Sequence, residues 1–550
     1  MNRHPILWTA MLAAVSASAG GCVDLLKGHD DMDFLVPADR LRQVETLDLD
    51  SASRISTTAP APSPASQRAD TLEQATVKLS LPAARAAALA NNLSLKVALL
   101  SPSIAAEGIT EAEARFESLL AADVSRATTD TPVSSALSGM NTTSDSATAS
   151  VRMPWRTGGW IEAYLPYNCY ETDNAFSTLN PSYTSDLSLS ISQPLLRGAG
   201  LRANTHAIRI ARWNTMKSEA LTKLEVIRVL AAVDRLYWRL YAAREQLRVR
   251  LQQQELAEAQ LQRARRQVKA GDKPEVEIVR AELGVAESAE AIILARNMVR
   301  ARQRELKRLL AKGGLGMDSE TEIIPDTPPD VLPYDLDPDR LVAMALGTRM
   351  ELLDLELKIA QDASTIDFAR NQTLPLVTVG YTYNVNGLGA SASDAFDLMF
   401  ERRFEDHRFG VHVEVPLGNQ AAQSRLRSAI RTRIQSLASL ELRKSLVGRE
   451  VRDSIDLIDA NWQRVVASRR RVELAERVLE AEQRQFDLGV RTSTEVLDAQ
   501  AGLADARSAE VNAVVEYQAA QVDLAVATGT LLGAARIRWE PAQPTGEGGK

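Results

Sequence analysis

The chain has 550 residues, of which 45% are hydrophobic, 25% charged and only 5% aromatic, a balance that excludes bulk disorder and, with Ala, Leu, Arg, Glu and Gln dominant, favours long helices. Its 64 basic and 71 acidic residues leave a net charge of −7, so a basic surface for nucleic acid is not indicated. Two cysteines and five histidines argue against a disulfide framework and against a zinc or histidine metal site.

The first residues have the layout of an export signal. A positively charged start is followed by an apolar stretch of small residues (6–19) and then by Gly20-Gly21-Cys22, so we predict a signal peptide at residues 1–21. Small residues directly before a cysteine resemble the lipobox of bacterial lipoproteins, which predicts that Cys22 becomes the acylated, palmitate-bearing first residue. The alternative is cleavage after Ala17-Ser18-Ala19, which leaves Cys22 an ordinary thiol that could pair with Cys169 in an oxidising compartment.

Residues 22–79 are predicted to be an N-terminal tether, because positions 51–65 are rich in Ser, Thr, Ala and Pro. A helix then begins at Ser80-Leu81-Pro82, where serine can cap and proline suits the first turn, and it runs to about Phe116. Beyond the first two dozen residues, no apolar run reaches the roughly 18 residues of a membrane helix.

Residues 119–194 alternate between apolar and polar side chains. Leu187, Leu189 and Ile191, for example, alternate with serines. This period of two predicts strands with one apolar and one polar face, and Thr157-Gly158-Gly159 is a turn signal between two of them. The stretch is long enough for four strands.

Helical periodicity then continues without a proline from about Asn204 to Lys269. At a rise of 1.5 Å per residue such a helix is about 100 Å long. A turn near Gly271 stops it, and another helix runs from Pro274 to about Leu310. Residues 80–317 form one half of the folded chain, and the proline-rich residues 318–337 are expected to be a linker.

The same order of elements recurs in residues 338–532. A helix to about Asn371 precedes a region, 375–416, that holds two alternating strands. A second long helix (419–488) ends at Gly489, and a last helix (494–530) follows. Residues 533–550 are expected to be a C-terminal tail.

The two halves can be superposed on their glycine breaks, at an offset of 489 − 271 = 218. At this offset Arg266-Gln267-Val268 faces Arg484-Gln485-Phe486. Near the first helix of each half the offset is 255, with Ala114-Arg115 on Ala369-Arg370, because the first strand region is longer. The pattern indicates an internal repeat of helix, strands, long helix, turn and helix, and not a short-period solenoid.

Neither half of the chain has enough apolar helix surface or enough paired strand edges to be stable alone. Each amphipathic helix has too little apolar face, and strands that face lipid must have every edge paired in a closed sheet, which demands several chains. The predicted fold class is therefore α+β, mostly long α-helices, with an α-barrel joined to a transmembrane β-barrel as a conduit. Half of the aromatic residues fall in the strand regions, as in membrane-interface girdles, although a soluble β-sandwich also favours them.

Two motifs resemble those of the TolC-like outer-membrane efflux family. The residues from Leu187 to Gly200, which include Gln193-Pro194 and Gly198-Ala-Gly200, resemble the family's end-of-strand motif, and those from Phe486 to Ala499 resemble its periplasmic helix-turn-helix tip. The similarity covers about residues 80–535. The charged segment from Asp394 to Phe409 is expected in an extracellular loop.

The resemblance implies a homotrimer in the lipid of the cell outer membrane, with helices that extend into the periplasm. The tip would dock a periplasmic adaptor (membrane-fusion) protein and an inner-membrane pump of the resistance-nodulation-division or ABC type. The chain would then be a lipid-anchored, passive export duct of a tripartite efflux or secretion system. The residues themselves show no catalytic constellation, so we predict no enzyme activity and no cofactor or metal.

The resemblance also implies roles for residues of the tip. Glu495 and Asp498, three residues apart on one helix face, would form two acidic rings at the periplasmic aperture of a trimer, although either could instead only favour the helix start. The matching positions of the first half are Glu277 and Arg280. Arg491 and Phe486 match positions that can latch the closed tip. The adaptor-contacting turns would comprise Gly271, Gly489, Val490 and Thr492.

Motifs of catalysis are absent from the sequence: there is no HExxH, no GxxxxGK[ST] and no GxSxG. Asp335, Asp337 and Asp339 could be imagined as a Ca²⁺ site, but a helix cap is the better interpretation. A periplasmic coiled-coil adaptor or scaffold stays open as the alternative function. The sequence indicates neither the exported substrate nor the pump.

Overall fold

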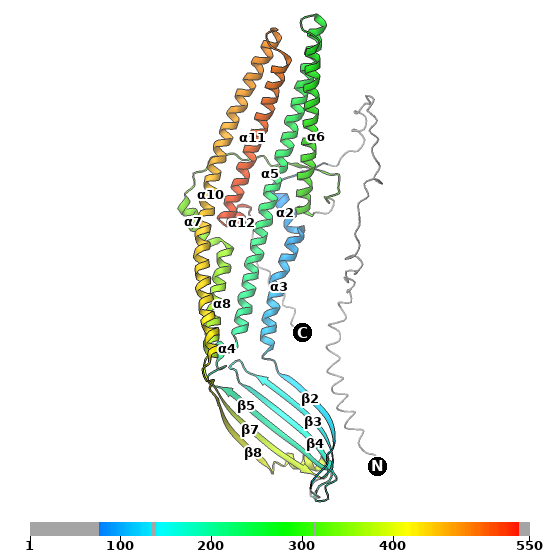
Figure 1. Ribbon diagram of the computed structural model, residues 1–550, viewed down its shortest axis with the longest axis vertical. Coiled ribbons are helices and arrows are strands. Elements are labelled where there is room, and N and C mark those ends of the chain that lie inside the picture. Colours follow the sequence, from blue (N-terminus) through cyan, green and yellow to red (C-terminus); the bar gives the residue numbers. More distant parts are fainter. Residues whose placement is uncertain (1–75, 135–138, 312–314, 538–550) are drawn as a thin grey trace, which may run out of the picture. The chain divides into compact units, whose positions relative to one another are not determined.

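The computed structural model describes residues 76–134, 139–311 and 315–537, and these belong to one unit of the chain. The expected signal peptide, Cys22 and the tether up to residue 75 lie outside the described residues, as does the tail from residue 538. The prediction of an α+β fold made mostly of long helices is confirmed (Figure 1).

The first helical stretch is divided into α2 (Leu81–Asn91) and α3 (Leu93–Ala114), instead of the single helix that we predicted. The break lies at Asn92, whose side chain accepts a hydrogen bond from the backbone N–H of Leu95 at 3.0 Å and donates one to the carbonyl of Leu309 at 3.0 Å. Asn92 thus caps α3 and ties the break to another helix, a contact that local periodicity does not reveal.

The first half continues with four strands and three helices. The strands are β2 (Leu119–Asp130), β3 (Asn141–Pro154), β4 (Trp160–Thr172) and β5 (Ser182–Pro194). The short α4 (Leu201–Asn204) leads into the long α5 (His206–Ala270), and α6 (Val276–Leu310) packs along α5.

The second half repeats this order with two strands. Its elements are α7 (Pro338–Thr348), α8 (Met350–Gln372), β7 (Leu376–Gly389), α9 (Ala392–Phe400), β8 (Glu405–Glu414), α10 (Gln420–Asp487), α11 (Ser493–Ala527) and α12 (Leu531–Ala534). The sequence pattern did not predict α9. The expected extracellular loop also ends earlier than Phe409, because β8 already begins at Glu405.

A small parallel sheet joins two segments that we expected to be irregular. β1 (Thr76–Leu79), at the end of the predicted tether, pairs with β6 (Glu322–Pro325) in the predicted linker. The buried hydroxyl of Tyr237 on α5 holds both segments, since it donates to the Leu79 carbonyl at 3.0 Å and accepts from the N–H of Thr327 at 2.9 Å. Four-residue strands paired across about 250 residues leave little periodic signal in the sequence.

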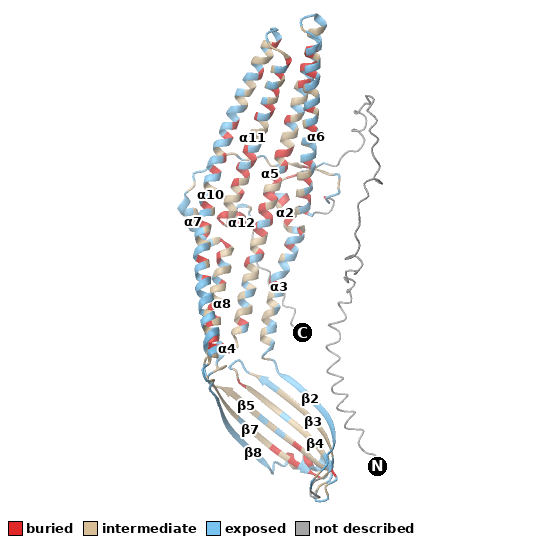
Figure 2. Cartoon of the chain, viewed as in Figure 1, coloured by how far each residue is buried: buried red, intermediate tan, exposed pale blue. Residues whose placement is uncertain are grey.

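The large sheet has six strands in the order β2-β3-β4-β5-β7-β8, and every neighbouring pair is antiparallel. Within the described residues, the outer edges of β2 and β8 pair with no other strand. All residues of both edge strands are exposed, as Figure 2 shows in pale blue. The sheet is therefore open in the part of the single chain that the structure describes.

The strand register sorts the side chains onto two contrasting faces. One row of directly paired residues on the apolar face is Leu120, Val151, Ala163, Leu189 and Tyr383. The other face is polar: serines and threonines face asparagines and one another, as in the pair Ser190 and Thr382, whose hydroxyls lie 3.1 Å apart. Because side chains alternate along a strand, one consistent register produces both faces.

The short helix α9 covers the end of the apolar face that lies away from the long helices. It packs on β7 and β5, and its Phe396 ring stacks on Tyr167 with 5.8 Å between the ring centroids. Val385 on β7 is consequently only 3% exposed.

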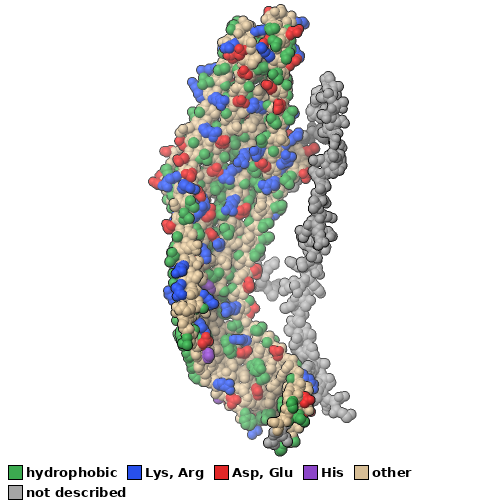
Figure 3. Space-filling model, in the orientation of Figure 1, with side chains coloured by type: hydrophobic (Ala, Val, Ile, Leu, Met, Phe, Trp, Pro, Cys, Tyr) green, Lys and Arg blue, Asp and Glu red, His purple; other side chains and the backbone are tan. Residues whose placement is uncertain are grey.

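The helices pack side by side, α3 on α5, α5 on α8 and α8 on α10, while α6 and α11 cover the far halves of α5 and α10. The four longest helices, α5, α6, α10 and α11, bury apolar residues along their length, shown in red in Figure 2. Figure 3 shows basic and acidic side chains interspersed over the helices. None of the described helices contains an apolar stretch long enough to cross a membrane.

Candidate functional site

The two turns between the long helices and their partners have the same backbone geometry. α5 is followed by Gly271 with φ 84°, and α10 by Gly489 with φ 81°, both in the left-handed region that favours glycine. The N–H of Asp272 donates to the Gln267 carbonyl at 2.9 Å, and the N–H of Val490 donates to the Gln485 carbonyl at 3.0 Å. These equivalent bonds lie 218 residues apart, at the offset found from the sequence.

Side chains of the first turn reach the backbone of the second. The ammonium group of Lys273 donates to the carbonyl of Arg491 at 2.9 Å and lies 5.0 Å from the ring centroid of Phe486. The carboxylate of Glu277 accepts a hydrogen bond of 2.7 Å from the backbone N–H of Ser493, the first residue of α11. The two repeats are therefore fastened together at their turns by one cation and one anion.

Glu277 is a buried carboxylate, with 3% of its surface exposed. Burial raises its pKa, but the hydrogen bond from the Ser493 N–H and the nearby Arg280 guanidinium, 2.7 Å away, outweigh that effect and hold the pKa below its ordinary value. The carboxylate thus stays ionised and satisfies a free N–H at the start of a helix in the other repeat.

Glu495, at the equivalent position of the second repeat, acts on its own helix instead. Its carboxylate accepts hydrogen bonds from the N–H of Thr492 at 2.7 Å and from the Thr492 hydroxyl. The first of these bonds and the reciprocal bond from the Glu495 N–H to the Thr492 side chain form a capping box at the start of α11. These bonds from Thr492 lower the pKa of Glu495 to about 2. The helix-start role, which the sequence left open, is the one that the single chain displays.

Arg491 and Phe486 both contact the first turn of α11. The Arg491 guanidinium contacts Gln485 at 3.0 Å, Glu482 at 3.3 Å and Glu495 at 3.4 Å. Phe486 is fully buried and packs with Leu479, Val496 and Leu503. Phe486 is thus a core residue of the second hairpin, whereas Arg491 holds the cap from the surface.

The remaining predicted tip residues are mostly open to solvent. Gly271, Gly489 and Asp498 are exposed, and Val490 is 73% exposed. Thr492 is partly buried as the N-cap of α11. Sequence reasoning missed Lys273 and Ser493, although the repeat offset offered a signal, since it places Lys273 opposite Arg491.

The end-of-strand motif forms the junction between the sheet and α5. Gly198 and Gly200 have φ of 76° and 89°, and the Gly198 N–H donates to the side chain of Asn371 at 2.8 Å. Gln193 contacts Thr157 in the β3–β4 turn, and the Gly200 N–H donates to the Thr157 carbonyl at 3.0 Å. Pro194 ends β5. The motif therefore anchors a strand turn and the end of α8 beside the start of α5.

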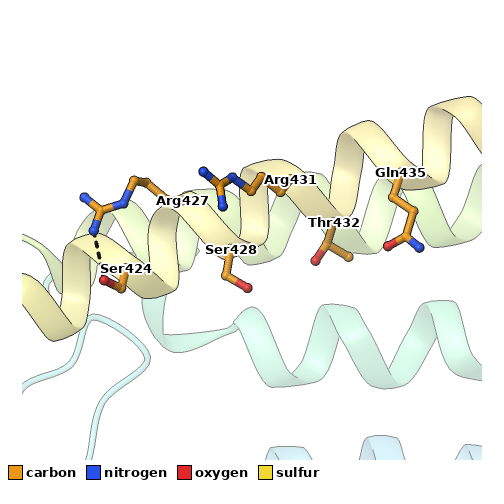
Figure 4. A pocket seen from close by; sticks show the side chains of 6 residues that line it. All are labelled: Ser424, Arg427, Ser428, Arg431, Thr432 and Gln435. Atoms are coloured by element: carbon orange, nitrogen blue, oxygen red, sulfur yellow. Dashed lines mark hydrogen bonds between the residues drawn. The ribbon is translucent and has the colours of Figure 1, made fainter.

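A shallow groove of about 420 Å³ runs along the part of α10 near the sheet (Figure 4). One face of the helix lines it, with Ser424, Arg427, Ser428, Arg431, Thr432 and Gln435. Arg427 donates to the Ser424 hydroxyl at 2.9 Å. The lining holds no carboxylate, cysteine or histidine, and no group of metal-ligating side chains occurs among the described residues.

Comparison with known proteins places this architecture. Residues 341–530 match the family described as outer membrane efflux protein. The outer membrane protein TolC of Vibrio cholerae serotype O1 is 30% identical over 182 residues, which are 32% of this chain and 40% of that relative. The match therefore spans less than half the length of the curated relative.

Solved structures extend the likeness to most of the chain. The structure of CusC has a TM-score of 0.61 at 16% identity and covers 82% of this chain and 92% of its own. The outer membrane protein VceC of Vibrio cholerae has a TM-score of 0.59 at 16% identity, with 82% and 96% covered. The CmeC outer membrane channel of Campylobacter jejuni has a TM-score of 0.60 at 14% identity, with 82% and 86% covered.

The fold and the paired turns thus define a duplicated, TolC-like protein. More particularly, residues 341–530 match the outer membrane efflux protein family, and the described chain shares its fold with solved outer-membrane proteins such as CusC and VceC.

Proposed function

We propose that this protein is the outer-membrane channel of a tripartite export system, a passive duct built from three copies of the chain. The observation that carries this proposal is the six-stranded sheet, which has one apolar face and, among the described residues, two unpaired edges. The sheet continues into long helices that end at paired glycine turns. Such a sheet satisfies its edges in lipid only when further copies close it.

The height of the apolar face supports a membrane location. Alternate residues from Val377 to Val385 on β7 belong to that face. At about 3.3 Å per residue and a tilt near 36°, this segment spans roughly 20–25 Å of the membrane normal, close to the apolar band of about 25 Å in outer-membrane barrels. The polar face would then line the bore.

Exposed apolar stripes on the outermost helices support assembly from several copies. On α3, Leu93, Val97, Leu100 and Ile104 follow helical spacing and are 61–71% exposed. On α10, Ile430, Ile434 and Leu437 form a second stripe, 40–61% exposed. Because α3 and α10 lie at opposite ends of the row of packed helices, α10 of one copy can cover α3 of the next.

The tip is the proposed aperture and docking end. In a trimer, Glu495 and the exposed Asp498 would each recur three times around the axis and attract cations. Val490 and its neighbour Leu488, 73% and 79% exposed, offer an apolar contact beside Gly489 to a periplasmic adaptor that links the duct to an inner-membrane pump of the resistance-nodulation-division or ABC type. Acylation of Cys22 would add a lipid anchor in the outer membrane, and mass spectrometry of the mature N-terminus tests it.

Fractionation of cells tests the proposed function. We expect the chain in the outer membrane, with β2 to β8 protected from protease added to isolated membranes. Recovery in the soluble periplasmic fraction would instead favour the adaptor or scaffold alternative. Gly489→Pro should impair export and leave membrane insertion intact, because proline cannot adopt the positive φ of the turn; normal export by this variant would reject the docking role of the tip.

A further inference from the structure

The first half of the chain contributes twice as many strands as the second. The surplus is the hairpin of β3 and β4, which is fully integrated into the sheet: β3 pairs with β2 along its length and β4 pairs with β5. Its turn also packs into the end-of-strand motif, where a Cβ on Gly158 would collide with the carbonyl of Gly198. The hairpin is thus a built part of the wall and not a surface insertion.

We propose that β8 of each chain pairs with β2 of the next so that all six strands of each chain enter the barrel wall, which gives 18 strands in a trimer and a barrel as wide as the helical tube that continues it. This inference rests on the proposed function, since it takes the trimeric outer-membrane duct as its starting point.

Strand direction permits this closure. β2 leaves the helices after α3, and β8 returns to them before α10. β2 and β8 are the first and the sixth strand of a sheet whose strands alternate in direction. β8 and the next copy's β2 therefore run antiparallel, like every other neighbouring pair of the sheet.

The position of the strand ends indicates the register. β2 begins at Leu119 and β8 ends at Glu414, both next to the helices. Pairing these ends places Phe409 opposite the partner subunit's Val124, Val411 opposite the partner subunit's Ala122, and Val413 opposite the partner subunit's Leu120. All these side chains belong to the apolar face, so the lipid-facing surface stays continuous across the seam.

This register also gives an acceptable barrel geometry. Within one chain the paired row that starts at Leu120 ends at His407 on β8. At the seam, the partner subunit's Leu120 instead meets Val413, six positions further along β8. A shift of six residues per six strands makes the shear equal to the strand number, which corresponds to a tilt of about 36°.

The six strands and the four helices of one chain occupy similar lengths of circumference. Six strands spaced about 4.8 Å apart and tilted by about 36° occupy roughly 36 Å of circumference. The four helices that meet the sheet, α3, α5, α8 and α10, occupy roughly 32–40 Å at axial distances of 8–10 Å. Without β3 and β4, the four remaining strands would occupy only about 24 Å. The extra hairpin therefore removes a narrowing of the bore where the duct enters the membrane.

Disulfide cross-linking in the full-length protein tests the seam. In a Cys169→Ser background, Val124→Cys with Phe409→Cys should yield covalent trimers on non-reducing gels, because paired strand residues lie within disulfide reach. The matched control is Val124→Cys with Val413→Cys, which uses the same face four residues out of register. We expect at least tenfold more cross-linked trimer from the first pair. Equal yields, or more from the control, would overturn the seam.

A strand count in a cryo-electron microscopy map of the protein in nanodiscs completes the test and stays informative if the cysteine variants fold poorly. Eighteen strands support the inference. A closed barrel of 12 strands, with β3 and β4 outside the wall, overturns it and leaves the export duct standing. A protein without a closed barrel contradicts the proposed function itself.

Discussion

At the scale of single residues, two equivalent carboxylates of the repeat have diverged in what they hold. Glu277 reaches across to the N–H of Ser493 in the other repeat, whereas Glu495 caps its own helix through Thr492. The sequence predicted both as acids of one tip, but their partners are backbone groups brought close only by the packing of α11 against α6 and α5. Motif spacing therefore located these residues and could not assign their contacts.

Removal of the buried Glu277 carboxylate should loosen the tip. Glu277→Ala leaves the N–H of Ser493 without its acceptor, a loss of about 1–3 kcal/mol for a buried donor. We expect a higher leak conductance in planar bilayers. The exposed neighbour Glu275→Ala serves as the control and should leave the conductance unchanged. Equal conductance of the two variants would show that this bond does not hold the tip closed.

The pH dependence of ion selectivity tests whether Glu495 lines the aperture. The folded protein lowers the pKa of this carboxylate to about 2. The charge, and the stability that the cap adds, are therefore fully present above the ordinary pKa and are lost only as the pH falls towards 2. In an Asp498→Asn background we therefore expect the reversal potential in a KCl gradient to report the same cation preference at pH 7 and pH 4. Adding Glu495→Ala should lower that preference at both values. If the cation preference instead falls with a midpoint near pH 4.5, or if Glu495→Ala does not change it, Glu495 does not line the aperture.

A buried ion pair between α2 and α5 offers a test of stability away from the tip. Arg85 donates to the fully buried Asp234 at 2.7 and 2.8 Å, and burial raises the pKa of Asp234 although Arg85 opposes that effect. Arg85→Ala should lower the free energy of unfolding, measured with urea, by about 3–5 kcal/mol, because it leaves a carboxylate buried without its partner. Arg85→Met with Asp234→Leu should restore most of the loss. If the Arg85→Ala variant is as stable as the parent protein, the ion pair is dispensable.

At the scale of elements, the sequence predicted the glycine turns and the alternation of strands because both are local patterns. Gly489 has a positive φ, and a Cβ there would meet no atom within 4 Å. The helix breaks at Asn92 and Arg349, the β1–β6 pair and α9 escaped prediction, since each depends on partners far along the chain. Arg349, for example, is buried and forms ion pairs with Glu351 and Glu450.

Two glycine substitutions of opposite sign test the turn geometry. Gly489→Ala should destabilise by about 1–2 kcal/mol through backbone strain alone, because the site has room for a methyl group. Gly502→Ala, within α11 and equally open, should stabilise by up to about 1 kcal/mol through helix propensity. Thermal unfolding followed by circular dichroism compares them. A stabilising effect at Gly489 would contradict its left-handed conformation.

At the scale of the whole molecule, the duplicated order of elements was visible in the sequence, and the strand pattern predicted that further copies would be needed to close the sheet. The amphipathic alternation of residues such as Leu187, Leu189 and Ile191 requires lipid or a second layer on one face. What the sequence could not supply is the sheet order and register, which join β5 to β7 across almost 200 residues and align their apolar faces. The exposed stripes on α3 and α10 became recognisable only once the row of helices was known.

The mass of the protein extracted from outer membranes in mild detergent is the most direct test of the trimeric duct. We expect three times the mass of the mature chain, held by a ring of paired β2 and β8 edges that resists dissociation. A stable single copy with its sheet edges shielded from solvent, recovered without detergent, would contradict it.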